Sequence, residues 1–301
     1  MLVFFAHGSE FMRQADFIRL LVLAAVWGAS FLFMRVIAPV LGALWTAELR
    51  VGLAGLALCV WMLFLREQLP ALRQWKQYLI LGAASSGFPA VLYSYAALHV
   101  PAGYSAIMNA TTPLWGALMA SLFLGEKLTQ RKLAGMFTGV LGVALLVKLG
   151  PVSLTTEVLL ALAACSVATI CYALAGVYTK KLSVSGSPTL LATASQLGAA
   201  VVLLPALPFA PLHATPTLNV ALAMAALALI CSAFAYLLYF RLIKDVGPTR
   251  ALTVTFLIPL FALIWGALFL NEHITLSTVA GGSAVVLATW LVAGAPKQAQ
   301  S

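Results

Sequence analysis

The segment PLWGALMASLFLGEKLT at residues 113–129 returns 146 residues later as PLFALIWGALFLNEHIT at residues 259–275. At the same offset, residues 93–145 align with residues 239–291 without a gap and share fourteen identical positions, twelve of them from residue 113 onward. The offset also pairs Arg50 with Gln196 and Gly52 with Gly198. Such an internal repeat predicts two modules built on one plan.

The composition indicates that the solvent of this chain is a lipid bilayer. Of 301 residues, 63% are hydrophobic and 8% are charged, whereas soluble domains have about 45–50% apolar and about 25% charged residues. The apolar runs are long and hydrophobic all round, which is typical of helices that face lipid. We therefore expect an all-α integral membrane protein.

A transmembrane helix needs about 20 apolar residues, and the chain contains ten runs of this kind. They cover residues 17–38, 42–64, 77–98, 102–124, 132–149, 158–179, 188–209, 217–240, 249–270 and 275–294. The connecting loops have about twelve residues at most, which leaves no room for a soluble catalytic or nucleic-acid-binding domain. No nucleic-acid partner is expected, although the formal net charge is +9.

Five spans in each half predict that the second half enters the membrane upside down relative to the first, because five is odd. The loop charges favour the same arrangement. Loop 125–132 carries Lys127, Arg131 and Lys132, whereas its counterpart at 271–278 carries no Lys or Arg. Fourteen of the seventeen Lys and Arg residues fall on the side of the N-terminus, so the positive-inside rule predicts that both termini are cytoplasmic.

These expectations divide the chain into four parts. Residues 1–16 form a cytoplasmic N-terminal tail, and residues 295–301 form a cytoplasmic C-terminal tail. Residues 17–149 form the first five-helix repeat, and residues 150–294 form the second, inverted one. Residues 1–11 do not resemble a signal peptide, and either Met1 or Met12 can be the start of the protein.

Three features together are similar to the EamA-type family of the drug/metabolite transporter superfamily. They are WGASFLFMR at residues 27–35, the proline pair Pro113 and Pro259, and the LFLGEKLT and LFLNEHIT segments. The resemblance implies ten transmembrane helices as two inverted five-helix repeats around a central cavity, in a bacterial inner membrane. It also implies export of small organic metabolites such as amino acids. The second half lacks a clear copy of the Trp27 motif, which is a departure from the repeat.

Three classes of function remain open, and a secondary transporter that works by alternating access is favoured. An enzyme is not expected, because the only aspartates, Asp16 and Asp245, lie outside the spans. No phosphate-binding loop is present, so ATP does not drive transport directly. No cofactor or metal is expected, since the four cysteines have no metal or redox spacing. A membrane scaffold or sensor is the third alternative.

The expected partners are a small-molecule substrate and the bilayer, with a proton as one candidate for a coupling ion. The sequence allows a monomer or a homodimer.

Ionisable side chains inside spans mark candidate pathway residues, because each costs about 2.5–3.5 kcal/mol to insert. Arg35, Glu48 and Arg50 meet this criterion. Arg50 either contacts substrate or holds helices together through backbone carbonyls. Arg35 is expected to extend toward the headgroups or to pair with Glu48, and Glu48 is the one candidate for a proton carrier within a span.

The paired prolines mark a second group of candidates. Pro113 and Pro259 are predicted to kink their helices and to free the carbonyls of Asn109 and Thr255, four residues earlier. Together with Thr112, these groups either bind substrate or re-satisfy the kinked backbone.

Aromatic residues form a third group of candidates, which with Ser30 of the Trp27 motif could line an organic-substrate cavity or only pack. They are Trp27, Tyr93, Trp115, Tyr172, Tyr236 and Tyr239. Tyr93 and Tyr239 are repeat counterparts. Glu126 and Glu272 are expected to be turn residues, followed by the helix N-caps Thr129 and Thr275.

Overall fold

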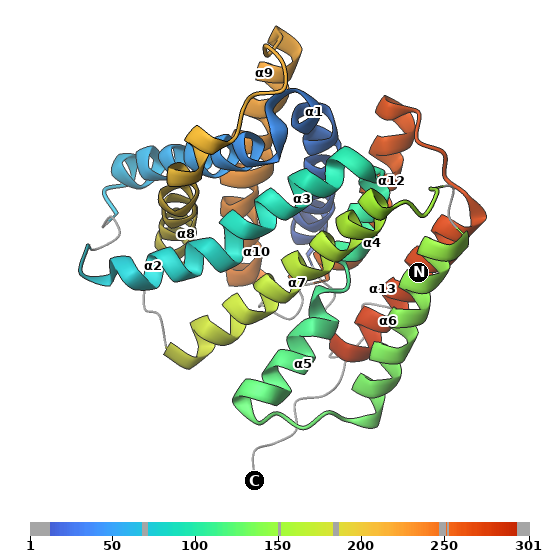
Figure 1. Cartoon of the computed structure of the whole chain (residues 1–301). Helices are drawn as coiled ribbons and strands as arrows, with labels where there is room; N and C mark the ends of the chain where they lie inside the picture. Colours follow the sequence, from blue (N-terminus) through green and yellow to red (C-terminus); the bar gives the residue numbers. More distant parts are fainter. Residues whose placement is uncertain are drawn as a thin grey trace.

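The computed structural model describes residues 13–67, 72–149, 152–182, 187–246, 251 and 253–293, and these contain helices and no strands (Figure 1). The predicted all-α membrane protein is confirmed at this level. The predicted tails fall largely outside the described residues, as do Met1, Met12 and residues 294–301.

The α-helices are α1 (Gln14–Phe64), α2 (Trp75–Gly82), α3 (Phe88–His99), α4 (Ala102–Asn109), α5 (Thr112–Leu124), α6 (Gln130–Leu149), α7 (Thr156–Leu182), α8 (Pro188–Leu203), α9 (Leu218–Ala225), α10 (Ala235–Val246), α12 (Val254–Leu270) and α13 (Leu276–Ala293). Two 3-10 segments, η2 (Leu72–Gln74) and η4 (Leu204–Phe209), and two π-helical segments, η3 (Ala83–Gly87) and η5 (Ala226–Phe234), join some of them.

Helix α1 is the longest element and contains two of the predicted apolar runs. Its 51 residues would extend about 76 Å at 1.5 Å per residue, far more than the roughly 30 Å of a hydrocarbon core. Gly42 breaks it, with φ 80° and ψ 165°, a conformation that favours glycine. Among the described residues, seven helical stretches, α1 included, are long and apolar enough to cross a membrane.

The proline pair behaves differently in the two halves. Pro113 lies in the first turn of α5, after a break between Asn109 and Thr112, whereas Pro259 lies inside the continuous helix α12. In the first half the helix is interrupted at Ala110 and Thr111, whose backbone stays in the right-handed helical region. The hydroxyl of Thr112 donates to the freed Asn109 carbonyl at 2.6 Å, so the hydroxyl re-satisfies the backbone, as the structural alternative predicted.

The two π-helical segments occupy corresponding places in the two halves. Moving η3 by 146 residues gives 229–233, which lies inside η5. A π segment contains one extra residue per turn and is rare outside functional sites. The repeat therefore includes an irregularity of the backbone as well as identical residues.

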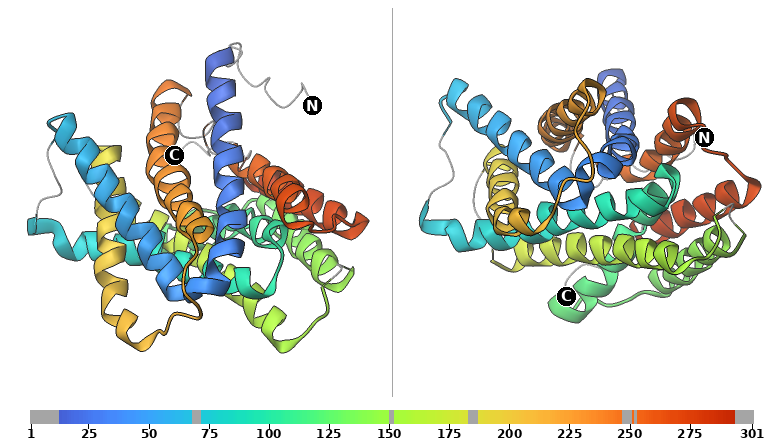
Figure 2. Two further views of the ribbon diagram at one scale, coloured as in Figure 1. Left: turned by 90° about the horizontal axis from the view of Figure 1, so that it is seen from above. Right: turned by 45° about the horizontal axis from the view of Figure 1, so that its top comes forward.

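Glycines allow helices from the two halves to meet at backbone distance. Helix α8 lies against α2, and a Cβ atom added to Gly198 would collide with the carbonyl of Tyr78. An added Cβ at Gly142 of α6 would lie 2.9 Å from the Gly281 carbonyl oxygen of α13, which runs alongside α6 in Figures 1 and 2. Small residues permit this close approach in membranes. The close packing of α8 against α2 places Gln196 next to η3.

Candidate functional site

A small polar cavity lies where elements of the two halves meet. Its walls come from α1, η3, α3, α7, α8 and α10 and consist of Arg50, Val51, Ser85, Ser86, Ala90, Tyr172, Gln196 and Tyr236. The volume is about 20 Å³, room for roughly one water. The solute-sized cavity that the resemblance implied is thus closed beside Arg50, because α8 and the tyrosines approach closely.

Two hydrogen bonds around this cavity are counterparts of each other in the repeat. Arg50 Nε donates to Ser232 Oγ at 3.0 Å, and Gln196 Nε2 donates to Ser86 Oγ at 3.4 Å. The offset of 146 relates Arg50 to Gln196 and Ser86 to Ser232. Each half therefore contributes a long polar side chain that reaches a serine in the π-helical segment of the other half. We call this arrangement the exchanged pair.

Among the described residues, Arg50 makes no hydrogen bond to a backbone carbonyl. Its partners there are the Ser232 hydroxyl and the Met34 sulfur, the latter at 3.6 Å. Among the ion pairs of the described residues, none includes Arg50. Arg50 thus links α1 to η5 through the Ser232 side chain, and a role for it in substrate contact stays a prediction.

The suggested pairing of Glu48 with Arg35 was wrong. Glu48 is 9% exposed, and its Oε2 is buried without a hydrogen-bond partner among the described residues. Arg35 instead donates to the Ala97 carbonyl at 2.6 Å and lies 3.9 Å from Glu272. The Arg35 side chain is 33% exposed, and its extension toward the headgroups stays a prediction. Glu48 remains as a buried carboxylate on α1, and the cavity next to Arg50 does not include it.

Four of the aromatic candidates form two ring pairs, one of which reaches the cavity through Tyr172. Tyr93 stacks on Tyr172 with ring centroids 6.4 Å apart, and its hydroxyl lies 3.1 Å from the Asn109 side-chain oxygen. Its repeat counterpart Tyr239 packs on Trp27, with ring centroids 5.1 Å apart. The structure thus brings five of the sequence candidates into these two groups, with Tyr172 shared with the cavity wall.

The remaining candidates lie apart from this centre or bond within their own helix. The Ser30 hydroxyl donates to the Trp27 carbonyl at 2.6 Å. Trp115 and Thr255 are half-buried, and Pro259 is buried within α12.

One end of the α4–α5 segment is bound by Glu272. Its carboxylate accepts the Ala102 backbone N–H at 2.9 Å, at the start of α4, and lies near Arg35 of α1. Helix N-termini favour negative charge. Glu272 follows the left-handed Asn271 that ends α12, and Thr275 caps α13 through the Thr278 N–H, so the predicted turn and cap are confirmed. We call these contacts the Glu272 lock.

The other end of the α4–α5 segment carries the counterpart, the Glu126 lock. Glu126 follows the left-handed Gly125 that ends α5, and Thr129 caps α6 as predicted. Lys180 of α7 donates to Glu126 at 2.9 Å, and this bond lowers the pKa of the carboxyl below its ordinary value. The offset relates Glu126 to Glu272 and Arg35 to Lys181, the neighbour of Lys180. Each glutamate thus contacts a basic residue near the end of the first predicted span of the other half.

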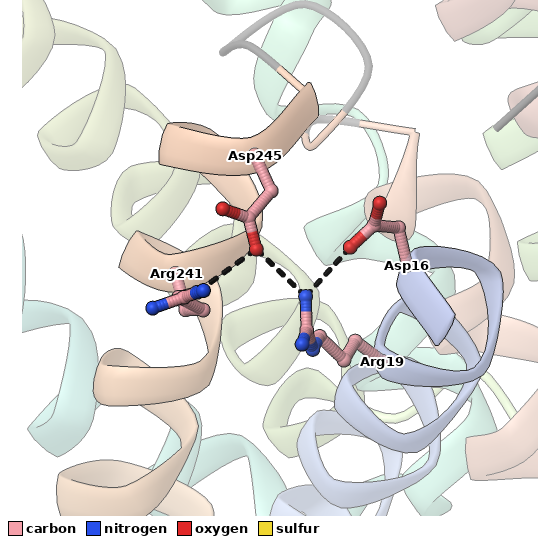
Figure 3. A network of polar contacts seen from close by, with 4 residues as sticks. All are labelled: Asp16, Arg19, Arg241 and Asp245. Carbon is pink, nitrogen blue, oxygen red and sulfur yellow. Dashed lines mark hydrogen bonds and ion pairs between the residues drawn. The ribbon is translucent and has the colours of Figure 1, made fainter. Parts of the chain in front are cut away.

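A third polar contact ties the start of α1 to the end of α10. Arg19 Nη1 lies 2.6 Å from Asp16 and 2.7 Å from Asp245, which also accepts from Arg241 at 2.9 Å (Figure 3). The dark-blue α1 and orange α10 run side by side in both views of Figure 2. The two aspartates outside the predicted spans therefore have structural partners.

Sequence reasoning missed Ser86, Ser232 and the role of Gln196. The signal was available, because the same offset that relates Arg50 to Gln196 relates the two serines. What sequence does not show is the crossing of the bonds between halves.

This fold and this site define a multi-pass membrane protein with a charged, hydrogen-bonding centre between helices and ion pairs at both ends of one helical segment. The sequence model of the EamA-like transporter family matches residues 17–148 and again residues 158–294. The chain belongs to this family, and it is a membrane transporter.

Several curated proteins are similar along most of their length. A protein of Streptantibioticus cattleyicolor named "Probable terminal-alkyne amino-acid exporter" is 27% identical over 93% of this chain and 94% of its own. Protein PecM of Dickeya dadantii is 29% identical over 85% and 84%. The "Uncharacterized inner membrane transporter YedA" of Escherichia coli K12 is 27% identical over 91% and 86%.

A solved crystal structure shares the fold, with a TM-score of 0.66, 15% identity, and coverage of 93% of this chain and 98% of that one.

Glu272→Ala should lower the melting temperature of the purified protein by a few degrees. The substitution leaves the Ala102 N–H without its charged acceptor and removes the carboxylate near Arg35, a loss of about 1–3 kcal/mol. Differential scanning fluorimetry measures the effect. His273→Ala is the control, because His273 is the exposed neighbour of Glu272 in the same loop. Equal shifts in the two variants would contradict the lock.

Proposed function

We propose that the chain is an alternating-access exporter of small organic metabolites. The observation that carries this proposal is the exchanged pair, in which two repeat-related hydrogen bonds cross between the two halves beside one cavity. Related contacts can trade places when two similar halves exchange conformations, which opens a central site first to one side and then to the other.

The proposal includes two inverted five-helix repeats, residues 17–149 and 150–294. The double match to the family model, the corresponding π-helical segments and the two locks support a two-part plan. The opposite charges of loops 125–132 and 271–278 support inversion and cytoplasmic tails at residues 1–16 and 295–301. A bacterial inner membrane is the proposed location, and the name of the Escherichia coli relative, an inner membrane transporter, supports it.

The described conformation fits an occluded step of such a cycle. Both locks are formed together, and the space beside Arg50 holds about one water. Release of the Glu272 lock would open the pathway on the outer side, and release of the Glu126 lock would open it to the cytoplasm. One chain contains both locks and the cavity, so a monomer suffices for the cycle.

The side chains of the cavity walls and the name of one relative support small organic metabolites as the substrate class. Tyr172 and Tyr236 line the cavity, and Tyr93 stacks on Tyr172, which gives aromatic surface that suits organic solutes. The similar protein of Streptantibioticus cattleyicolor is named an amino-acid exporter, which makes amino acids the first substrates to test.

Glu48 is the proposed carrier if a proton is the coupling ion. Its buried, unpartnered oxygen lies within a span, where carboxylates commonly relay protons.

Counterflow in proteoliposomes tests the function. Vesicles loaded with each unlabelled amino acid, a nucleoside or an aromatic toxin receive a trace of the labelled compound, and we expect transient accumulation for at least one amino acid. The control is vesicles without protein. Absence of flux for every solute would contradict a transporter cycle and favour a scaffold, whereas chemical conversion of a solute would favour a membrane-embedded enzyme. A pH gradient in the same vesicles tests proton coupling.

A further inference from the structure

Arg50 carries a positive charge, and its hydrogen-bond partners among the described residues are neutral groups. The guanidinium carries five N–H donors, and its contacts among the described residues are one hydroxyl and one thioether. The walls of the cavity beside it contain no Asp or Glu. Because a guanidinium inside a membrane span is costly without a partner, the free donors of Arg50 are suited to an anion that enters the cavity.

Gln196 supplies the second half of this site. It is 3% exposed, and its Oε1 is buried without a hydrogen-bond partner among the described residues, while its amide nitrogen bonds Ser86. If the amide were turned round, one end would still bond Ser86 and the other would lack a partner. Gln196 belongs to the walls of the same cavity that Arg50 lines, and its buried Oε1 is an acceptor without a partner among the described residues.

The charge of the walls limits the ligand to one negative group. Arg50 is the one Lys or Arg among the cavity residues, and its other neighbours are hydroxyls, an amide and apolar groups. A phosphate group, with about −1.5 to −2 charge at pH 7, would exceed what one guanidinium neutralises. A carboxylate carries one charge and matches the planar guanidinium in two parallel hydrogen bonds.

We propose that Arg50 binds the carboxylate of the transported substrate and that Gln196 Oε1 accepts a hydrogen bond from an amino or hydroxyl group beside that carboxylate. The substrate class is therefore an α-amino or α-hydroxy acid, with its side chain toward Tyr172. This inference rests on the proposed function, because the ligand is the transported solute. Binding requires the cavity to widen from its occluded volume of about 20 Å³.

A binding experiment with the full chain in lipid nanodiscs tests the site. The probes are the twenty amino acids, the carboxamide of each acid, and for each acid that binds the matching α-hydroxy acid and the acid without the α-substituent. We expect at least one amino acid to bind by isothermal titration calorimetry and its carboxamide to bind at least tenfold more weakly. The hydroxy acid should bind comparably, and the unsubstituted acid should bind more weakly.

Variants separate the two contacts. Arg50→Gln should weaken binding of the acid at least tenfold and leave binding of the carboxamide unchanged. Gln196→Leu should remove the preference for the α-substituent and keep the preference for the carboxylate. Arg50→Lys, which keeps the positive charge, should retain part of the affinity. The control is Arg13→Gln, because Arg13 is exposed just before α1.

Equal affinity for acid and carboxamide, or no binding by any acid, would overturn the site. Flux of another solute without a carboxylate preference would overturn the site and leave the transporter function in place. Binding of an acid without any flux would support the site and contradict the proposed function.

Discussion

Gly198→Ala should lower the melting temperature of the protein and reduce the yield of folded material. The new Cβ would collide with the Tyr78 carbonyl of α2 and would lie 2.8 Å from the Tyr78 carbonyl carbon. Because these are backbone atoms, no flexible side chain can move aside to relieve the clash. Overpacking of this kind costs about 1–3 kcal/mol, and more where backbone is displaced. Size-exclusion chromatography and scanning fluorimetry measure the result.

Gly176→Ala is the matched control for this prediction. Gly176 lies in α7, is exposed, and an added Cβ would meet no atom within 4 Å. Alanine is favoured over glycine in a helix by about 1 kcal/mol, so this variant should be unchanged or slightly more stable. The same sign of change in both variants would contradict the close backbone contact between α2 and α8.

Arg50→Ala should reduce transport about a hundredfold or more while leaving folded protein in the membrane. Loss of two charge-assisted hydrogen bonds of about 1.5–3 kcal/mol each accounts for a factor of this size. The loss of folding stability is smaller than the loss of transport, because the folded protein loses the contacts of Arg50 with the Ser232 hydroxyl and the Met34 sulfur. Counterflow rates in proteoliposomes with equal protein content measure the effect.

The control for Arg50→Ala is Arg13→Ala, which removes an exposed arginine at the start of α1. Its transport rate should match that of the unchanged protein. A melting temperature close to the starting value confirms that Arg50→Ala is folded. Near-normal flux in folded Arg50→Ala would show that the arginine serves packing alone.

Much of the helix pattern could be predicted from the sequence, because apolar length is a local property. The helices lie within a few residues of predicted apolar runs, and Thr129 and Thr275 cap the helices assigned to them. The break at Gly42 inside α1 was also consistent with two separate runs. Local chemistry was sufficient in each case.

The partners of charged residues could not be predicted, because they depend on how helices pack. Sequence spacing suggested Glu48 for Arg35, yet Arg35 lies beside Glu272, far away in the chain. Pro113 and Pro259 have the same sequence context, but one begins a helix and the other lies within one. The hydrogen bonds of the exchanged pair could not be predicted for the same reason, although the repeat relates Arg50 to Gln196 and Ser86 to Ser232.

Cross-linking of the two locks tests the central claim of an alternating-access cycle. In a background without the four native cysteines, Arg35→Cys with Glu272→Cys, and separately Lys180→Cys with Glu126→Cys, are joined by a cleavable bifunctional thiol reagent in proteoliposomes. Counterflow is then measured before and after reduction. The account predicts that either cross-link stops flux and that reduction restores it. Undiminished flux through fully cross-linked protein at either lock would contradict the account.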